Sequence, residues 1–150
     1  MKQKADILRA DISDIPEITG VEEKCIPGGW SEKGFSDWLQ NKNTVIFKAV
    51  LDGKTVGFAN GSWVLDEGEL LNIAVLENYR NMGIAGELFN FLEKYLKEKK
   101  VRKIFLEVRE KNLPAISFYE KHGFIKNGLR KDYYKNPADN GVLMMKNIGE

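Results

Sequence analysis

The segment between residues 69 and 86 holds the most informative arrangement of chemical groups in the chain. An apolar run, Leu70 to Val75, stops at a polar turn that contains Arg80, and Gly83 then opens a stretch with apolar residues at helical spacing. A strand that enters a helix through such a loop leaves the first backbone N–H groups of the helix unpaired, at the positive end of its dipole. The pattern therefore predicts a seat for an anion such as a diphosphate.

The loop lacks two common phosphate-binding patterns. Neither G-x-x-x-x-G-K-[ST] nor G-x-G-x-x-G is present, because Gly83 and Gly86 form only G-x-x-G. What is present is R-x-x-G-x-A, formed by Arg80, Gly83 and Ala85. Small residues at these positions also let a helix pack closely on a sheet, so the loop alone leaves a binding role and a packing role open.

Two further side chains could handle protons. Glu107 interrupts the apolar run of residues 102–108, where a buried strand is expected. A carboxylate there is paired structurally, retained for proton transfer, or already at the solvent-exposed end of the strand. Tyr119 lies on the apolar face of the following helical segment, where it is either a core tyrosine or a proton donor.

Composition limits the class of protein. The chain has 150 residues, 43% hydrophobic and 30% charged, which suits one globular domain with a sizeable core. A net charge of +1 argues against nucleic acid or membrane as a partner. One cysteine, Cys25, and one histidine, His122, rule out an internal disulfide and predict no metal site. Without a signal-peptide core or a membrane-length apolar run, we expect a cytoplasmic protein, as a monomer or weak dimer.

The predicted elements bring the chemical groups to one edge of a sheet. Strand 69–75, helix 84–99, strand 102–108 and helix 113–122 alternate, which predicts a parallel strand pair joined by a right-handed crossover. Ligands of such sheets bind beyond the carboxyl ends of the strands. The loop that follows residue 75 leaves from one of these ends.

The remaining segments predict antiparallel pairing at the start of the sheet. Strand-like runs at 44–51 and 55–65 flank Asp52-Gly53, a hairpin signal. Further elements are expected as strand 5–10, a helix that Ser13-Asp14 caps and that reaches about Cys25, helix 31–39, and closing strands 124–134 and 142–146. The expected fold is α+β in α/β/α layers: a mixed sheet of about seven strands, antiparallel at the start, with a parallel pair in the middle and helices on both faces.

Two separate motifs resemble the GNAT acyltransferase superfamily. R-x-x-G-x-A resembles its coenzyme-A loop, [Q/R]-x-x-G-x-[G/A], and a second match is N-x-x-A-x-x-x-Y-x-x-x-G-F, which begins at Asn112. Over nearly its whole length the chain is similar to the ribosomal-protein-alanine N-acetyltransferases of the RimI type. The matching segments are W-S-E-K-G-F (30–35), L-N-I-A-V (71–75), L-E-V-R (106–109), F-Y-E-K-H-G-F (118–124) and R-K-D-Y-Y (130–134).

This resemblance implies an N-acetyltransferase that moves an acetyl group from acetyl-CoA to a primary amine, the N-terminal alanine of a ribosomal protein. It implies direct attack, with Glu107 as the base and Tyr119 as the acid, and no metal. The cofactor-binding residues it implies are Ile73, Ala74, Val75, Arg80, Asn81, Met82, Gly83, Ile84, Ala85, Gly86 and Asn112. On the acceptor side it implies Trp30, Tyr133 and Tyr134.

Two segments depart from the family pattern. Residues 27–30, P-G-G-W, carry extra glycine, and residues 139–141, D-N-G, replace an acidic stretch before the last strand. Both belong to the acceptor side, so the acceptor is the least determined part of the reaction. Two alternatives remain: the same chemistry on a small amine such as a polyamine, amino acid or antibiotic, and a coenzyme-A-binding module without turnover.

Overall fold

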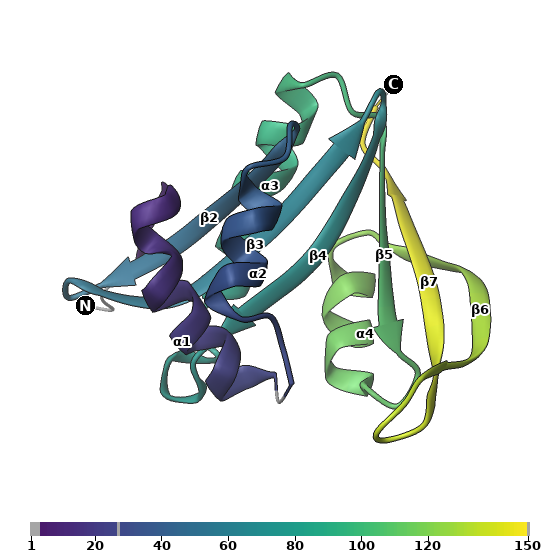
Figure 1. The fold of residues 1–150 in the computed structure, drawn as a ribbon. Coiled ribbons are helices and arrows are strands. Elements are labelled where there is room, and N and C mark those ends of the chain that lie inside the picture. Colours follow the sequence, from purple (N-terminus) through teal and green to yellow (C-terminus); the bar gives the residue numbers. More distant parts are fainter. Residues whose placement is uncertain (1–3, 27, 150) are drawn as a thin grey trace.

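The computed structural model describes residues 4–26 and 28–149, so Pro27 of the glycine-rich junction lies outside the described residues. Its centre is a seven-stranded sheet in the order β1-β2-β3-β4-β5-β7-β6 (Figure 1). The strands are β1 Asp6–Arg9, β2 Thr44–Leu51, β3 Lys54–Val64, β4 Glu67–Val75, β5 Lys103–Arg109, β6 Ile125–Tyr134 and β7 Asp139–Asn147. The helices are α1 Ile15–Cys25, α2 Glu32–Leu39, α3 Ile84–Glu98 and α4 Leu113–Lys121, with short 3-10 turns at Ile12–Asp14 and Glu77–Tyr79. The predicted fold class is confirmed.

Local sequence accounts for most element boundaries. Asp52 and Gly53 both have positive φ, 51° and 75°, as a two-residue hairpin turn requires. Ser31 accepts a hydrogen bond from the Gly34 N–H and so caps α2. α1 begins at Ile15 with Asp14 as its N-cap residue, as the Ser13-Asp14 pair predicts, and a 3-10 turn capped by Asp11 precedes it.

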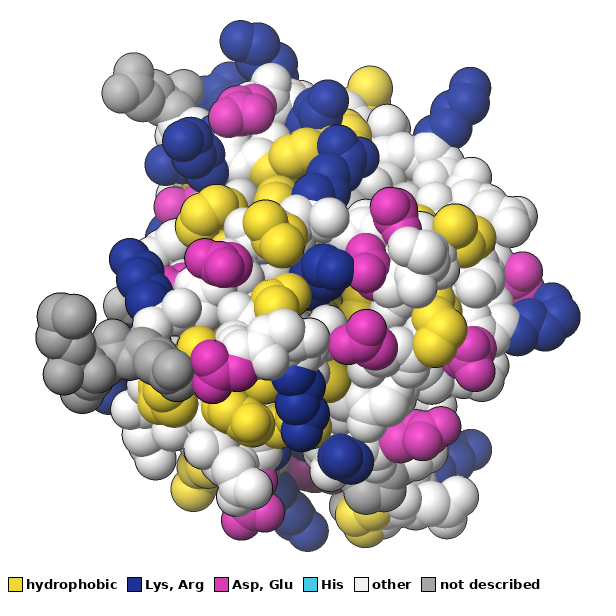
Figure 2. Space-filling view, turned by 90° about the vertical axis from the view of Figure 1, so that its left-hand side faces the viewer, with side chains coloured by type: hydrophobic (Ala, Val, Ile, Leu, Met, Phe, Trp, Pro, Cys, Tyr) yellow, Lys and Arg dark blue, Asp and Glu magenta, His cyan; other side chains and the backbone are white. Residues whose placement is uncertain are grey.

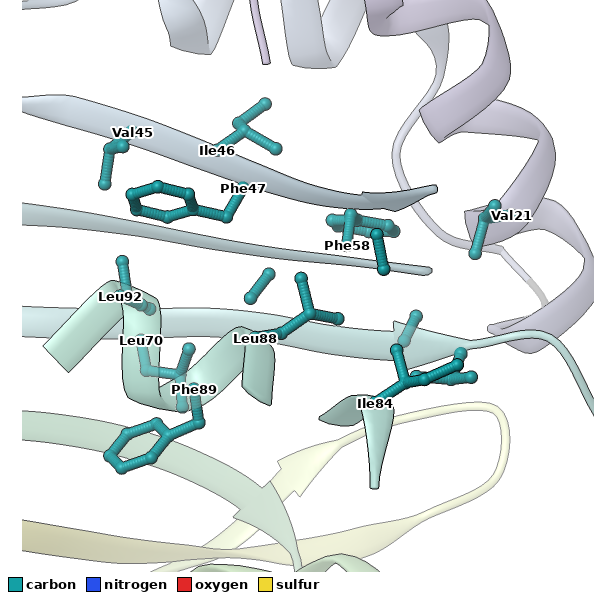
Figure 3. Packing of buried hydrophobic residues seen from close by; sticks show 14 of the residues in the cluster. Val21, Val45, Ile46, Phe47, Phe58, Leu70, Ile84, Leu88, Phe89 and Leu92 are labelled. Carbon is teal, nitrogen blue, oxygen red and sulfur yellow. The ribbon is translucent and has the colours of Figure 1, made fainter. Parts of the chain in front are cut away.

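Helices cover both faces of the sheet. α1 and α2 lie on one face and α3 on the other (Figure 1). Leu88, Leu92 and Leu96 of α3 are buried against the strands, and Figure 3 shows the first two within the core. β3 has glycine, Gly57 and Gly61, where α3 packs most closely on it. A Cβ at either position would lie 3.4 Å or less from a leucine side chain of α3. Close packing of α3 thus sets where its amino end lies relative to β4.

The parallel pair, β4 and β5, is joined over a short length only. The paired residues are Glu67 with Lys103, Gly68 with Ile104, and Glu69 with Phe105. Beyond them the two strands diverge toward their carboxyl ends (Figure 1). A β-bulge at Leu71 shifts the register between β3 and β4 at this point, and a bulge bends the strand that carries it.

The surface carries charges of both signs. Figure 2 shows basic and acidic side chains intermixed over the face that it displays, as expected for a net charge of +1. Among the described residues, no helix combines the length and apolar character needed to cross a membrane. Within the same residues, no three His, Cys, Asp or Glu side chains gather as a potential metal site.

Candidate active site

The carboxyl end of β4 turns backbone groups toward the gap beside β5. The Leu76 N–H donates to the Val56 carbonyl oxygen at 2.8 Å, which makes these two residues a hydrogen-bonded pair across β3 and β4. Because such pairs alternate along antiparallel strands, the backbone groups of Ile73 and Val75 point away from β3. The gap therefore offers backbone donors and acceptors that no neighbouring strand takes up.

A cavity of about 490 Å³ occupies this gap and brings together residues far apart in sequence. It joins the end of β4 to the end of β5 and the start of α4. The predicted site residues that line it are Ile73, Ala74, Val75, Arg80, Ala85, Glu107, Asn112, Tyr119 and Tyr134. Candidate cofactor-binding and catalytic groups thus share one space.

The amino end of α3 lies next to this cavity. Gly83 precedes the helix with φ of 81°, and no side chain caps the first turn. Asn81 also has positive φ, 63°, so the loop is tightly curled. Asn81, Met82, Gly83, Ile84 and Gly86 do not line the cavity described above. Since the Ile84 side chain is buried in the core, this loop offers an anion mainly its backbone N–H groups.

Arg80 makes an internal contact. Its Nε donates to the Val75 carbonyl oxygen at 2.9 Å, and its Nη2 lies 3.8 Å from Cys25 Sγ. Cys25 Sγ also reaches the same carbonyl, at 3.5 Å. The guanidinium group therefore links the end of α1 to the end of β4.

Glu107 has one carboxylate oxygen paired and one without a partner. Oε1 lies 3.4 Å from Arg130 Nη2, whereas Oε2 is buried without a hydrogen-bond partner among the described residues. Glu107 lines the cavity in the gap and also a second cavity of about 610 Å³, which runs along the β3–β4 hairpin and β6. Glu69 lines this second cavity, and burial first, then Glu107, raises the pKa of its carboxyl group.

Two tyrosine hydroxyl groups complete the chemistry of the gap. The Tyr119 ring packs edge-on against Phe118 and Phe124. Burial, and secondarily Tyr134, raises the pKa of the Tyr119 hydroxyl to about 12. Burial and the charge of Glu107 raise the pKa of Tyr134 as well. Both hydroxyl groups therefore remain protonated at neutral pH and can donate hydrogen bonds.

Arg109 fixes one wall of the cavity. It lies two residues beyond Glu107 on β5, donates to the Pro137 carbonyl oxygen at 2.8 Å and stacks 4.4 Å from the centroid of the Tyr134 ring. Arg109 therefore holds the connection between β6 and β7 beside the candidate base.

The Asn112 side chain accepts a hydrogen bond from the Ala115 N–H at 3.3 Å and so caps α4, as predicted.

Two residues expected on the acceptor side do not line the cavity. The Trp30 ring packs against Phe35 and Trp38, with centroids 5.2 and 5.7 Å away. Tyr133 is 48% exposed, and its ring meets the Tyr134 ring edge-on. Their roles toward an acceptor stay predictions.

Several residues of the cavity were not singled out from the sequence. They are Cys25, Ile26, Leu71, Asn72, Val108, Arg109, Pro114 and Ala115. Asn72 carried a signal, since it is a polar residue inside the apolar run from Leu70 to Val75. No feature of the sequence near Cys25 and Ile26 indicates that the end of α1 reaches β4.

Comparison with known proteins identifies the family. The Acetyltransferase (GNAT) family matches residues 15–124. The chain belongs to this family. It is accordingly an acetyl-CoA-dependent N-acetyltransferase.

Similar proteins cover nearly the whole chain. A [Ribosomal protein bS18]-alanine N-acetyltransferase of Haemophilus influenzae is 40% identical over 141 residues, covering 92% of this chain and 95% of its own. The ribosomal-protein-S18-alanine N-acetyltransferase of Escherichia coli has a crystal structure with a TM-score of 0.90 and 31% identity, covering 97% of this chain and 95% of that one. Arabidopsis thaliana NAA60 in complex with acetyl-CoA has a TM-score of 0.86 at 22% identity, covering 96% and 98%, and shows the shared fold.

Proposed function

We propose that this enzyme acetylates the N-terminal amine of a protein chain, and that its acceptor is the N-terminal alanine of a ribosomal protein. The names of the Haemophilus influenzae and Escherichia coli relatives support this acceptor. One observation carries the proposal: the Glu107 carboxylate lines both the cavity in the gap and the cavity along the face of the sheet. A thioester in the first and an amine from the second would meet at this carboxylate.

The gap has the groups that acetyl-CoA requires. Acetyl-CoA supplies an activated thioester, a pantetheine chain with amides and a diphosphate. The gap-facing backbone of Ile73 suits the amides, and the Val75 N–H suits the thioester carbonyl, where it would stabilise developing negative charge. The uncapped amino end of α3 suits the diphosphate. Asn112 keeps its amide N–H groups available, because its cap of α4 uses the oxygen.

Glu107 is the proposed base. The attacking nitrogen must lose a proton before or during addition to the thioester carbonyl, and the buried Oε2 of Glu107 has no partner among the described residues. Proton removal by a positioned carboxylate, directly or through one water, typically contributes about 10²- to 10⁴-fold in rate. Arg130 Nη2 lies 3.4 Å from Oε1 of Glu107 and pairs with that oxygen. The other oxygen, Oε2, is therefore the one that would accept the proton.

Tyr119 is the proposed donor to the departing sulfur. With its pKa raised to about 12, transfer of its proton to a thiolate, whose conjugate acid has pKa about 8.5, is uphill by roughly three to four pH units. Tyr119 therefore assists by donating a hydrogen bond to the sulfur as negative charge develops there. This refines the role of full proton donor that the family resemblance implies.

The acidity of amines favours a protein N-terminus as the acceptor. An α-amino group has a pKa of about 7.7–8.0, against about 10.4 for lysine. At pH 7 roughly a tenth of the former is neutral, but well under a thousandth of the latter. A site with one carboxylate base is therefore better matched to an N-terminal amine than to a lysine or an alkyl polyamine.

Release of free coenzyme A tests the proposal. Purified enzyme and acetyl-CoA are mixed with an Ala-initiated peptide of a ribosomal protein, and mass spectrometry locates the acetyl group. The same peptide with a blocked N-terminus is the matched control, and spermine, free amino acids and an aminoglycoside are competing acceptors. We expect turnover with the free N-terminus alone. Turnover confined to small amines, or coenzyme-A binding without turnover on any acceptor, contradicts it.

A further inference from the structure

Glu22 is a buried carboxylate that the proposed reaction does not use. Its side chain is 1% exposed, in the middle of the apolar face of α1. Oε2 accepts two hydrogen bonds, whereas Oε1 is buried without a partner among the described residues. An incompletely paired carboxylate in a core is costly, and an apolar residue of similar size is often the more stable choice. Its presence calls for a role other than stability.

The contacts of Glu22 join three parts of the site. Its Oε2 accepts from the Trp30 N–H, at the start of α2, and from Asn72 Nδ2 of β4, both at 3.3 Å. Its backbone carbonyl oxygen accepts from the Ile26 N–H at 2.7 Å. One residue therefore holds both ends of the connection between α1 and α2 and attaches that connection to β4.

The β4 contact lies where the parallel pair separates. Asn72 follows the bulge at Leu71, and its N–H is taken by Asn60 Oδ1 at 3.0 Å. The next residue of β4, Ile73, has its backbone groups turned toward the gap. Glu22 thus fixes the α1–α2 connection to the strand at the point where the gap opens.

The end of α1 and the first residue of the connection form part of the wall of the gap. Cys25 and Ile26 line the cavity together with Glu107 and Tyr119. Cys25 ends α1, which lies on one face of the sheet, whereas α3 lies on the other face (Figure 1). The amine would meet the thioester at Glu107, so with the diphosphate at α3 this wall stands beside the place where the acceptor arrives.

We propose that Glu22 is a positioning residue for the acceptor: its carboxylate holds the α1–α2 connection against β4 and so sets the acceptor-facing wall of the active site. This inference rests on the proposed function. Gly29 supports it independently, because a Cβ at Gly29 would lie 2.7 Å from Glu22 Cγ and 2.9 Å from its Oε2. The glycine of this junction leaves room for the buried carboxylate.

Kinetic variants test the proposal. Glu22→Ala removes both side-chain hydrogen bonds, and we expect the KM for the acceptor peptide to rise about tenfold while the KM for acetyl-CoA changes less than about twofold. Glu22→Gln keeps an oxygen that can accept both bonds and should restore the acceptor KM. Glu23→Ala, at the exposed neighbouring position, is the matched control. Equal changes in both KM values in a folded Glu22→Ala variant would overturn the proposal.

A glycine pair provides a test with Glu22 intact. Gly29→Ala forces the carboxylate or the connection to move, whereas a Cβ at Gly20 of α1 meets no atom within 4 Å. We expect Gly29→Ala to raise the acceptor KM about as much as Glu22→Ala does, and Gly20→Ala to leave it unchanged. This comparison stays decisive if Glu22→Ala fails to fold. A wild-type acceptor KM in Gly29→Ala contradicts the proposal.

Amide hydrogen exchange separates this inference from the proposed function. In the wild type the Trp30 N–H is bonded to Glu22, so Glu22→Ala or Gly29→Ala should speed its exchange about tenfold or more, with amides of β3 unchanged. Should no Ala-initiated peptide be acetylated by the wild type, the proposed acceptor is wrong, yet this measurement still decides whether Glu22 holds the connection. Unchanged exchange at Trp30 in both variants overturns the inference.

Discussion

The guanidinium Nε of Arg80 donates a hydrogen bond of 2.9 Å to the carbonyl oxygen of Val75, five residues earlier. This carbonyl turns away from β3 and toward the gap, so Arg80 holds the peptide plane at the end of β4. The first position of the R-x-x-G-x-A motif therefore shapes the strand that precedes the anion seat. An arginine that served only to attract a diphosphate by its charge would not need this hydrogen bond to Val75.

Arg80→Lys distinguishes shaping from charge. Lysine keeps the positive charge but lacks the planar guanidinium that reaches Val75. We expect the KM for acetyl-CoA to rise about tenfold in both Arg80→Lys and Arg80→Ala, with the acceptor KM unchanged. Steady-state kinetics at two salt concentrations measure this, with Arg9→Lys at the far end of β1 as the control. Full activity in Arg80→Lys indicates that charge alone matters.

Glu107→Gln removes the proposed base and keeps its shape. We expect kcat at pH 7 to fall at least about a hundredfold, with the KM for acetyl-CoA unchanged. Activity should recover in part at high pH, because the amine then loses its proton without help. A pH–rate profile from pH 6 to pH 10 measures this.

Glu69→Gln is the matched control for Glu107→Gln. Glu69 lies on the same cavity wall, and burial raises the pKa of its carboxyl group. We expect this variant to retain most of the activity. Should Glu69→Gln lose activity while Glu107→Gln keeps it, the base is Glu69.

Tyr119→Phe removes the hydroxyl group and keeps the ring that packs on Phe118 and Phe124. We expect kcat to fall roughly ten- to a hundredfold, the usual effect of losing a hydrogen bond to a charged group. Because the wild-type hydroxyl has a pKa of about 12, its ionisation should not limit the rate below pH 10. A loss of thermal stability with unchanged kcat would assign Tyr119 a packing role.

Local signals in the sequence predict the scaffold of the site. The apolar run of β4, the glycine of the loop and the helical spacing of α3 are adjacent in the chain, so their order indicates a strand, an anion seat and a helix. The alternation of strand and helix predicts the parallel pairing of β4 and β5, which the structure confirms. Asp52-Gly53 predicts its hairpin because both residues tolerate positive φ.

Contacts between distant segments account for what the sequence leaves undetermined. The length of the parallel pairing depends on a bulge in β4, and bulges depend on the neighbouring strand. Glu22 and Asn72 are fifty residues apart, and one carboxylate in an apolar helix face does not indicate its partner. Trp30 has a local environment of aromatic residues, and only the fold decides that its ring packs inward.

The buried carboxyl group of Glu22 makes a prediction about stability and pH. Burial raises the pKa of this group above its ordinary value, partly offset by the Trp30 N–H. Between the ordinary and the raised pKa the folded state therefore holds more protons than the unfolded state, so the free energy of unfolding decreases as pH rises through that interval. Glutamine cannot titrate and should not show this decrease.

Glu22→Gln should consequently be at least as stable as the wild type at pH 7.5, and its advantage should shrink as the pH falls to 4. Urea unfolding at the two pH values measures the difference, and Glu23→Gln at the exposed neighbouring position should show none. Together with an unchanged acceptor KM, this result would show that hydrogen bonding, and not the charge, is what the site requires of Glu22. A Glu22→Gln variant that is less stable than the wild type at pH 7.5 means instead that the ionised carboxylate is stabilised where it lies.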